Sequence, residues 1–302
     1  MWMSPLQHDR PDWEHDGQGW PNRAFSQFVT AGGLRWHVQQ MGAGPVLLLL
    51  HGTGAATHSW RDLMPLLAQQ FTVIAPDLPG HGFTTAPAYA QMSLPGMATA
   101  VAALLATLGV TPELALGHSA GAAILIRLGV EGDIAPRGII SINGALLPWR
   151  GLPAHIFSPA AKLLAGNSLM SRLLAWRASN GREVERLVAN TGSTLEPAGV
   201  ELYRRLIRCP AHVRAALSMM ANWNLDLIEE ALPQLHTPLF LLVGEGDLTV
   251  SPREAERVRE LLPSAELITL PALGHLAHEE QPAQVAALVC QIAERLARER
   301  TD

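Results

Sequence analysis

The chain contains the sequence Glu113-Leu-Ala-Leu-Gly-His-Ser-Ala-Gly-Ala-Ala-Ile-Leu-Ile-Arg127, in which a short apolar run, a glycine-flanked serine and a helix-like run follow one another. Gly117-His-Ser119-Ala-Gly121 is the Gly-x-Ser-x-Gly pattern of a nucleophile elbow, in the strand–turn–helix context that this turn requires. Glycine two residues before and after the serine leaves room in a strained turn where a Cβ would not fit easily. The pattern therefore predicts that Ser119 is a catalytic nucleophile at the start of a helix.

A serine nucleophile needs a general base, and the base needs an acid that orients it. Two later apolar runs, 239–243 and 266–270, have strand character, and Asp247 and His275 follow them closely. Open α/β sheets place their sites just past the carboxyl ends of such strands, and the chain order Ser, Asp, His is the expected one. We predict His275 as the base and Asp247 as the acid. The weaker alternatives are His278 for the base and Asp226 or Glu245 for the acid.

Backbone N–H groups near the serine must also stabilise the oxyanion of an acyl-transfer intermediate. Ala120, the residue after the nucleophile, is predicted to supply one donor. The loop His51-Gly-Thr-Gly54 follows a strand-like run and is predicted to supply the other, with Thr53 the best candidate and Gly54 the next. His51 is interpreted as a structural residue. His118, beside the serine, is interpreted as structural or as part of a substrate pocket.

The composition narrows the class of protein. The 302 residues are 48% hydrophobic and 16% charged, with a net charge of −5, which is typical of a globular protein. No basic surface for nucleic acid is expected from this balance. Cys209 and Cys290 match no metal or redox spacing and are expected to be free thiols in a reducing compartment.

Several kinds of site and segment are not expected. His275-x-x-His278 has no third ligand in view, so we predict no metal site. We predict no cofactor, because the chain has no P-loop motif and no Gly-x-Gly-x-x-Gly after its first strands. The longest apolar stretch, 94–110, contains Pro95 and Gly96, and the first 21 residues have no apolar core. Neither a transmembrane segment nor a secretory signal is therefore expected.

Strand-like and helix-like segments alternate in the first and last parts of the chain. The predicted strands are 24–30, 34–41, 45–50, 71–75, 114–116, 138–142, 239–243 and 266–270. The predicted helices are 60–69, 94–108, the run after the elbow, 252–262 and 282–298. This alternation indicates an α/β fold with a mostly parallel, eight-stranded sheet and helices on both faces. The first 22 residues are interpreted as an extended arm packed by its tryptophans.

The alternation breaks between residues 148 and 232, where several helices and no strand-like run are expected. An all-helical insertion between two strands of one sheet is best interpreted as a lid. The predicted organisation is a first part of the core at 1–147, a helical lid at 148–232 and a second part of the core at 233–302.

The predicted lid combines arginines with large apolar side chains. One interpretation is an amphipathic helical lid with a solvated basic face. The other is a pocket for a large, flat, apolar ligand with carboxylates, whose acids arginine side chains would bind. The candidate substrate-binding residues on this interpretation are His118, Trp149, Trp176, Met219, Met220 and Trp223.

Taken together, the motifs resemble those of the α/β-hydrolase superfamily over Phe25 to Arg298. The residues that carry the resemblance are His51-Gly-Thr-Gly54, Asp77-Leu-Pro-Gly-His-Gly82, Gly117-His-Ser-Ala-Gly121, Asp247 and His275.

Longer phrases resemble, more narrowly, the magnesium chelatase accessory proteins of bacteriochlorophyll biosynthesis. They are Ala31-Gly-Gly-Leu-Arg-Trp-His-Val38, Leu49-Leu-His-Gly-Thr-Gly-Ala-Ala-Thr-His-Ser-Trp-Arg-Asp-Leu63, Ile142-Asn-Gly-Ala-Leu-Leu-Pro148, Met219-Met-Ala-Asn-Trp223 and Gly274-His-Leu-Ala-His-Glu-Glu280. This resemblance implies a place near the insertion of Mg²⁺ into protoporphyrin IX in phototrophic bacteria. It also implies a porphyrin as the small-molecule ligand, magnesium chelatase subunits as partners, and a cytoplasmic location that could include the periphery of the photosynthetic membrane.

Three hypotheses on function remain open. The first is a serine hydrolase that uses Ser119, His275 and Asp247 on an ester-type or other acyl bond, with a tetrapyrrole as substrate. The second is a non-catalytic protein that binds a tetrapyrrole or supports the chelatase, because a fold does not by itself determine use of its site. The third is a generic esterase or carbon–carbon bond hydrolase unrelated to pigment synthesis.

Overall fold

The centre of the sheet consists of short aliphatic strands that are buried on both faces. β3 (Val46–Leu50), β5 (Leu114–His118), β6 (Ile139–Ile142) and β7 (Leu239–Gly244) form its middle. Apart from Val46, every residue of these four strands is buried. Continuous apolar runs of this kind are typical of parallel strands covered by helices on both sides.

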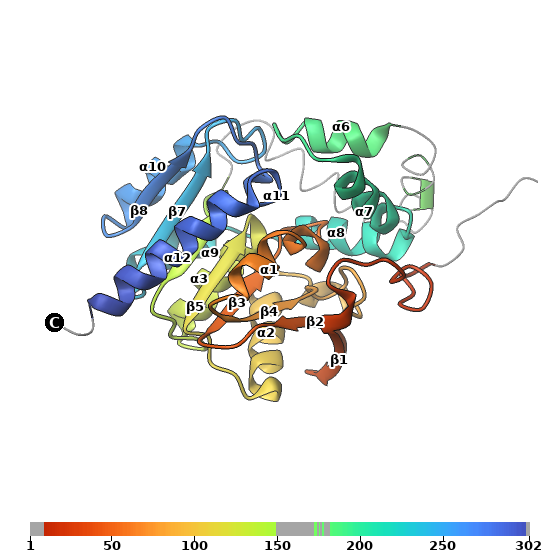
Figure 1. Ribbon diagram of the computed structural model, residues 1–302, viewed down its shortest axis with the longest axis horizontal. Helices are drawn as coiled ribbons and strands as arrows, with labels where there is room; N and C mark the ends of the chain where they lie inside the picture. The colour runs from red at the N-terminus through yellow and green to blue at the C-terminus, as the bar shows by residue number, and fades with distance from the viewer. Residues whose placement is uncertain (1–8, 149–171, 174, 176, 178–181, 300–302) are drawn as a thin grey trace, which may run out of the picture.

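The computed structural model describes residues 9–148, 172, 173, 175, 177 and 182–299. Its sheet has eight strands in the order β1-β2-β4-β3-β5-β6-β7-β8 (Figure 1). The outer strands are β1 (Ser26–Ala31), β2 (Leu34–Met41), β4 (Thr72–Pro76) and β8 (Glu266–Leu270). β2 is antiparallel to both β1 and β4, and all other pairs are parallel. The predicted eight-stranded, mostly parallel α/β sheet is confirmed.

Alternate residues of β3 serve two separate hydrophobic clusters. Leu48 and Leu50 pack with α2 (Leu94–Leu108) and α3 (Ala120–Glu131), whereas Leu47 and Leu49 pack with α1 (Leu63–Leu67) and α12 (Pro282–Arg298). Successive side chains of a strand point to opposite faces, so the aliphatic run supplies both clusters at once. α10 (Arg253–Leu261) joins the cluster of α2 and α3.

Between β6 and β7 the regular elements among the described residues are helices. They are α6 (Glu183–Ala189), α7 (Pro197–Ile207), α8 (Pro210–Asn222), α9 (Asp226–Ala231) and the 3₁₀ turn η4 (Leu232–Gln234). Figure 1 shows α6, α7 and α8 grouped together at one end of the molecule, beyond the short α11 (Ala277–Glu280). α9 instead packs on α3, and its Ile228 belongs to the main core cluster. The division into a lid and two core parts stays a prediction.

Two local expectations are wrong. The predicted helix 60–69 begins late, because a 3₁₀ turn η2 (Thr57–Trp60) precedes α1. The ring of Pro65 would clash with the carbonyl of Arg61 in a continuous helix. The described part of the predicted extended arm forms turns instead, with Trp20 N–H donating to Gly17 O at 3.1 Å. A further short turn, η1 (Arg23–Phe25), then leads into β1.

Trp13 and Trp20 of this N-terminal segment pack on the core as expected, and Trp2 lies outside the described residues. Trp13 lies edge-on to Phe28 and Phe83, with ring centroids 5.4 and 4.8 Å apart. Trp20 is buried and donates from Nε1 to Thr57 Oγ1 at 3.0 Å. The remaining short helix of the first half is η3 (Tyr89–Gln91), just before α2. In the part of the chain that the structure describes, no helix has the length and hydrophobicity needed to cross a bilayer.

Candidate active site

Ser119 lies in the sharp turn between β5 and α3. Its backbone has φ 51° and ψ −116°, a conformation that L-residues rarely adopt. Its N–H donates to Ile142 O at 3.1 Å, and its carbonyl accepts from Ala122 N and Ala145 N at 3.2 Å each. These bonds hold the strained turn in place, and the side chain remains partly exposed. The structure therefore has the nucleophile-elbow geometry that the sequence predicts.

The glycines of the elbow are required by close packing. A Cβ on Gly117 would lie 2.5 Å from Ala122 N, and a Cβ on Gly121 would collide with the carbonyl oxygen of Leu50. Gly52, in the loop after β3, is also confined, since its Cβ would lie 3.0 Å from Ser119 Cβ. The loop after β3 and the elbow therefore pack in close contact.

The structure brings the predicted base and acid together from the loops after β8 and β7. His275 Nδ1 donates to Asp247 Oδ2 at 2.7 Å, and both side chains are buried. The other carboxylate oxygen, Oδ1, accepts from Thr249 N at 2.7 Å and Val250 N at 2.9 Å. These three hydrogen bonds orient the imidazole, and because Nδ1 donates to Asp247, Nε2 is the ring nitrogen left to accept a proton.

Among the described residues, Ser119 Oγ has no hydrogen bond to His275. Catalytic hydrogen bonds are often long or misaligned without substrate and form only in the complex. The three predicted triad residues therefore lie at neighbouring strand ends, β5, β7 and β8, with the acid–base bond made and the serine–base bond open.

The alternatives to the triad residues lie elsewhere. His278 is buried beneath the site, with its ring 4.6 Å from Trp60 and 4.5 Å from His118. Its two ring nitrogens have no hydrogen-bond partner within the described ranges. Asp226 begins α9 and Glu245 is exposed. The geometry thus singles out His275 and Asp247.

Two side chains hold the carbonyl group of His275. Asn143 Nδ2 donates to Gly274 O and His275 O at 2.9 Å each, while its Oδ1 accepts from Gly244 N at 2.8 Å. His118 Nε2 donates to the same His275 carbonyl at 3.0 Å. Burial lowers the pKa of His118 well below its usual value, and the neighbouring His278 and His275 add to this effect. His118 is thus a buried, neutral side chain that supports the loop 271–276 after β8, which carries His275 and is called the base loop below.

Sequence reasoning missed the role of Asn143. This residue follows β6 with φ 46°, a backbone conformation that asparagine tolerates better than most residues. An asparagine directly after a buried strand was the available signal, because open α/β sheets place functional side chains there.

A segment between α6 and α7 connects the base loop to the loop 245–252 after β7, which carries Asp247 and is called the acid loop below. The carbonyl oxygen of Thr191 accepts from Leu248 N at 3.2 Å and from His275 N at 3.1 Å. Ser193 Oγ accepts from Leu276 N at 2.8 Å. The placement of the acid and the base therefore depends on residues within the predicted lid range. No local sequence motif predicts these contacts.

The two predicted oxyanion donors border the serine. Within the described ranges neither Thr53 N–H nor Ala120 N–H has a protein acceptor, as an oxyanion hole requires. Thr53 Oγ1 donates to Met219 Sδ at 3.5 Å, so α8 contacts this loop. His51 is buried, donates from Nδ1 to Gly52 O at 2.8 Å and accepts from Leu78 N at 2.9 Å. It is a structural support of the loop.

The remaining candidate substrate-binding residues have different environments. Met219 is fully buried against the loop after β3, whereas the adjacent Met220 is 44% exposed. Trp223 is partly buried and packs on the main core cluster. Trp149 and Trp176 lie outside the described residues. Among the described members of this group, Met219 is the one with a hydrogen bond to Thr53, a predicted oxyanion donor.

A buried carboxylate braces the loop after β4. Asp77 Oδ2 accepts from His37 Nδ1 at 2.7 Å and Phe83 N at 2.9 Å, and its Oδ1 accepts from Thr57 N at 2.7 Å. Burial would raise the pKa of Asp77, but His37 and these donors hold it well below its ordinary value. Asp77 therefore acts as a buried anchor and not as a titrating group.

A second buried carboxylate ties the core to α7. Tyr203 donates its hydroxyl to Glu279 Oε1 at 2.6 Å, and Arg61 forms an ion pair with the other oxygen. Burial raises the pKa of Glu279, and Arg61 opposes the rise. Because Tyr203 belongs to α7 and Glu279 to α11, this contact holds the helices after β6 against the base loop. In the described portion of the chain, no three His, Cys, Asp or Glu side chains are grouped as metal ligands.

Comparison with known proteins adds a family. The family model described as alpha/beta hydrolase fold matches residues 45–282. The Magnesium-chelatase 30 kDa subunit of Rhodobacter capsulatus is 37% identical over 262 residues, which are 86% of this chain and 91% of that protein.

Solved structures give the same fold at lower identity. An alpha/beta hydrolase fold protein from Burkholderia ambifaria superimposes with a TM-score of 0.74 at 23% identity, covering 88% of this chain and 97% of that one. A thermophilic esterase from Thermogutta terrifontis gives a TM-score of 0.69 at 23% identity, covering 90% and 98%. At this identity the likeness extends to the fold alone.

Proposed function

This chain belongs to the α/β-hydrolase fold family, and on that premise we propose that it is a serine hydrolase acting on an ester-type or other acyl bond. One observation carries the proposal: a strained serine follows the carboxyl end of β5, and the loops after the parallel strands β7 and β8 hold Asp247 and His275 hydrogen-bonded at 2.7 Å. A strained serine beside a bonded acid–base pair is the arrangement that activates a hydroxyl nucleophile.

Each residue has a defined task in the proposed reaction. Ser119 Oγ attacks the acyl carbon while its proton passes to His275 Nε2, and Asp247 stabilises the resulting imidazolium. The imidazolium then protonates the leaving group, and a water molecule activated by the same imidazole releases the acyl group from Ser119. Thr53 N–H and Ala120 N–H hold the oxyanion, and losing one such donor costs about 3 kcal/mol in the barrier.

We further propose that the hydrolase works beside a magnesium chelatase in bacteriochlorophyll synthesis, with chelatase subunits as partners and a tetrapyrrole ester as the favoured substrate class. The support is the 37% identity to the Rhodobacter capsulatus subunit, which extends over 91% of that protein. The helices between β6 and β7 are proposed to act as the lid, since Met219 contacts Thr53 in the loop after β3 and Tyr203 contacts Glu279 in α11, the helix that follows His275.

A fluorophosphonate probe, which reacts with activated serines, tests the hydrolase proposal. We expect the pure protein to be labelled at Ser119 and Ser119→Ala to remain unlabelled. Ser251 lies in an exposed position after Asp247, so Ser251→Ala is a matched control that should label like the wild type. A folded wild-type protein that stays unlabelled would contradict the proposal.

A non-catalytic accessory role is the second candidate. The observation in its favour is the 37% identity to a protein named as a magnesium-chelatase subunit, a name that states no hydrolytic activity. Restoration of pigment formation in a host that lacks its own copy distinguishes the two. Ser119→Ala should fail to restore it if hydrolysis is the role, and should restore it largely if binding or chelatase support is the role. A generic esterase would label with the probe and have no effect on pigment.

A further inference from the structure

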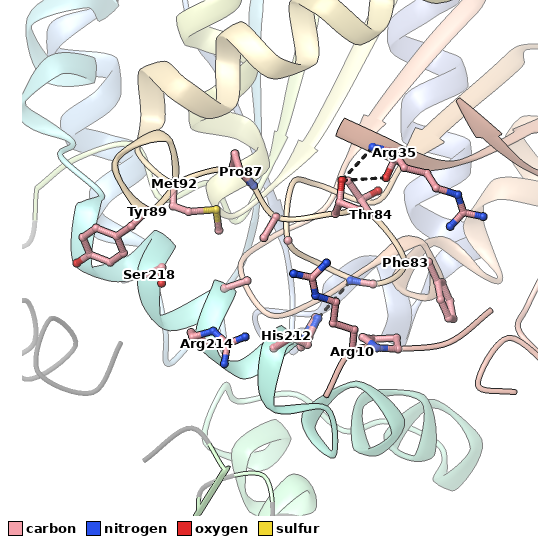
Figure 2. A pocket seen from close by; sticks show the side chains of 17 residues that line it. Arg10, Arg35, Phe83, Thr84, Pro87, Tyr89, Met92, His212, Arg214 and Ser218 are labelled. Carbon is pink, nitrogen blue, oxygen red and sulfur yellow. Dashed lines mark hydrogen bonds between the residues drawn. The ribbon is translucent and has the colours of Figure 1, made fainter. Parts of the chain in front are cut away.

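A cavity of about 520 Å³ lies between the loop after β4 and α8, apart from the candidate active site. Figure 2 shows the side chains that line it, drawn from the N-terminal segment, the loop 80–92 and α8. Its volume is within the range of small-molecule sites. Ser119, Asp247 and His275 do not line it.

The wall toward the active site is formed by His212. Its Nδ1 accepts from Gly82 N at 3.2 Å, and its Nε2 donates to Gly54 O at 3.1 Å. Burial lowers the pKa of His212 to about 4, so the imidazole is neutral near pH 7. The bond to Gly54 places this side chain between the cavity and the loop that carries Thr53. Because both ring nitrogens already have hydrogen-bond partners, His212 is not available to a ligand.

The charge on the lining is entirely positive. Arg10, Arg35 and Arg214 line the cavity, and no carboxylate does so among the described residues. Figure 2 shows the guanidinium of Arg10 at the centre of the group and that of Arg214 beside His212. Arg35 lies at the edge, where its guanidinium stacks 3.7 Å over the Phe28 ring.

Arg10 and Arg214 retain donors for an anion. Arg10 has no ion pair within the ranges that the structure describes. Arg214 forms one contact of 3.3 Å with Asp9, and this pair is 34% and 47% exposed, so it contributes little stability. Each guanidinium carries five N–H donors, and two guanidinium groups in one cavity favour a carboxylate, sulfonate or phosphate.

The rest of the lining is apolar and partly aromatic. Phe83, Met92, Pro87 and Ala215 contribute hydrocarbon surface, and Tyr89 presents its ring at the rim with 47% exposure. Such walls bury an apolar body, whereas a small inorganic anion would leave them without a partner.

We propose that this cavity is a second ligand site, which binds an amphipathic anion: an apolar, ring-sized body that carries an acidic group held by Arg10 and Arg214. The proposal does not depend on hydrolysis, since none of the triad residues takes part in it.

The test is a fluorescence titration of the full chain with anilinonaphthalene sulfonate, an aromatic anion whose emission rises in apolar sites. Phenylnaphthylamine, which has the same rings without the sulfonate, is the matched neutral probe. We expect saturable binding of the sulfonate at one site and weaker binding of the neutral probe. Charge-assisted hydrogen bonds are strong enough that Arg10→Ala combined with Arg214→Ala should weaken sulfonate binding by roughly tenfold or more.

Two further proteins make the result specific. Arg186 and Arg298 are exposed arginines that do not line the cavity, with 69% and 79% of their side chains exposed, and replacing both by Ala should leave binding unchanged. Ser218→Trp should obstruct the cavity and reduce binding of both probes. Equal sulfonate affinity in the wild type and the Arg10/Arg214 double variant overturns the proposal. So does the absence of saturable binding, or neutral-probe binding as tight as that of the sulfonate.

Discussion

Ser119 is held in a costly backbone conformation by bonds to its surroundings. A non-glycine residue in such a region costs on the order of 1–3 kcal/mol and persists only when neighbouring structure enforces it. Here the enforcement comes from Ile142 O, Ala122 N and Ala145 N, all bonded to the main chain of Ser119 within 3.2 Å. The strained turn places Ser119 directly beyond the end of β5.

At the same scale, Asn143 is predicted to position the base. Asn143→Ala removes two donors from the carbonyls of Gly274 and His275 and the acceptor for Gly244 N. Buried groups left without partners cost about 1–3 kcal/mol each, so we expect the free energy of unfolding to fall by about 2–4 kcal/mol. The rate of fluorophosphonate labelling of Ser119 should fall by roughly tenfold, because a displaced imidazole is a poorer base.

The matched control is Asn190→Ala. Asn190 is exposed at the end of α6, and its side chain has no hydrogen bond within the described ranges. This variant should keep both the denaturation midpoint and the labelling rate. Unchanged labelling in folded Asn143→Ala would show that Asn143 does not position His275.

At the scale of elements, α3 approaches β3 as closely as its glycines allow. Gly121 faces the Leu50 carbonyl at the first turn of α3, and Gly129 lies two turns later, where an added Cβ would lie 3.2 and 3.3 Å from methyl groups of Leu235 and Ile139. The same helix therefore contains one glycine that meets backbone and one that meets only flexible side-chain ends.

The two glycines predict opposite outcomes for one substitution. Gly121→Ala should prevent folding or lower the melting temperature severely, because the Leu50 carbonyl cannot move without breaking the sheet. Gly129→Ala should change stability by less than about 1 kcal/mol, since alanine's better helix propensity offsets a small displacement of neighbouring side chains. Thermal denaturation of both proteins gives the comparison, and a Gly121→Ala protein as stable as Gly129→Ala would refute it.

The contact between α7 and α11 gives a second prediction about elements. Tyr203→Phe removes the hydroxyl that donates to Glu279 Oε1 at 2.6 Å and leaves a buried carboxylate with one partner fewer. We expect a loss of about 1–2 kcal/mol in the free energy of unfolding, measured by urea denaturation. Tyr89→Phe, at a 47% exposed position, is the control and should be neutral. Equal stability of the two variants would mean that this hydrogen bond does not hold α7 to the core.

At the scale of the whole molecule, several histidine side chains are buried in the interior. Burial is the largest cause that lowers the pKa of each member of this group: His51, His58, His81, His118, His212 and His278. The unfolded chain would protonate these side chains near pH 6.5. Below that pH the unfolded state therefore binds more protons, and stability falls as the pH decreases.

Carboxyl groups oppose this trend but are fewer. Burial raises the pKa of Glu254 to about 7 and also raises that of Glu279, so both add stability as the pH falls through that range. His212 alone, with a folded pKa of about 4, removes on the order of 3 kcal/mol by pH 4. We expect the histidines to dominate, with a melting temperature that is steady above pH 7 and drops steeply below pH 6.5.

His58→Phe tests the origin of this acid sensitivity. His58 is fully buried against Trp20 and Tyr203, and within the described residues neither ring nitrogen is hydrogen-bonded. Phenylalanine fits an aromatic site without a proton to bind, so the drop in melting temperature from pH 8 to pH 5 should become smaller. His236→Phe, at an exposed position, should leave the drop unchanged. An identical pH profile in both variants would contradict the assignment.

The sequence could predict the sheet because its strands are local features. Aliphatic runs such as 46–50 and 239–244 are buried on both faces whatever surrounds them, and the helices between them show their own period. Ser119, Asp247 and His275 could likewise be proposed from position, since each follows a strand in a parallel sheet. The start of α1 was missed because the effect of Pro65 was not weighed against the apolar pattern.

Other features depend on contacts between distant segments and leave no local pattern. Asn143 holds backbone groups more than 100 residues away, and Thr191 bridges the acid and base loops from within the helical insertion. Met219 and Met220 are neighbours in sequence, but the phase of α8 buries one and exposes the other.

The amino-acid sequence alone determined the α/β architecture, the elbow and the residues that follow the strand ends, because hydrophobic period and steric need act over a few residues. The tertiary structure alone decided which side chains hold the base, which carboxylates are buried and where a positively charged cavity opens. Hydrogen bonds and burial at those places are set by segments that meet only after the chain has folded.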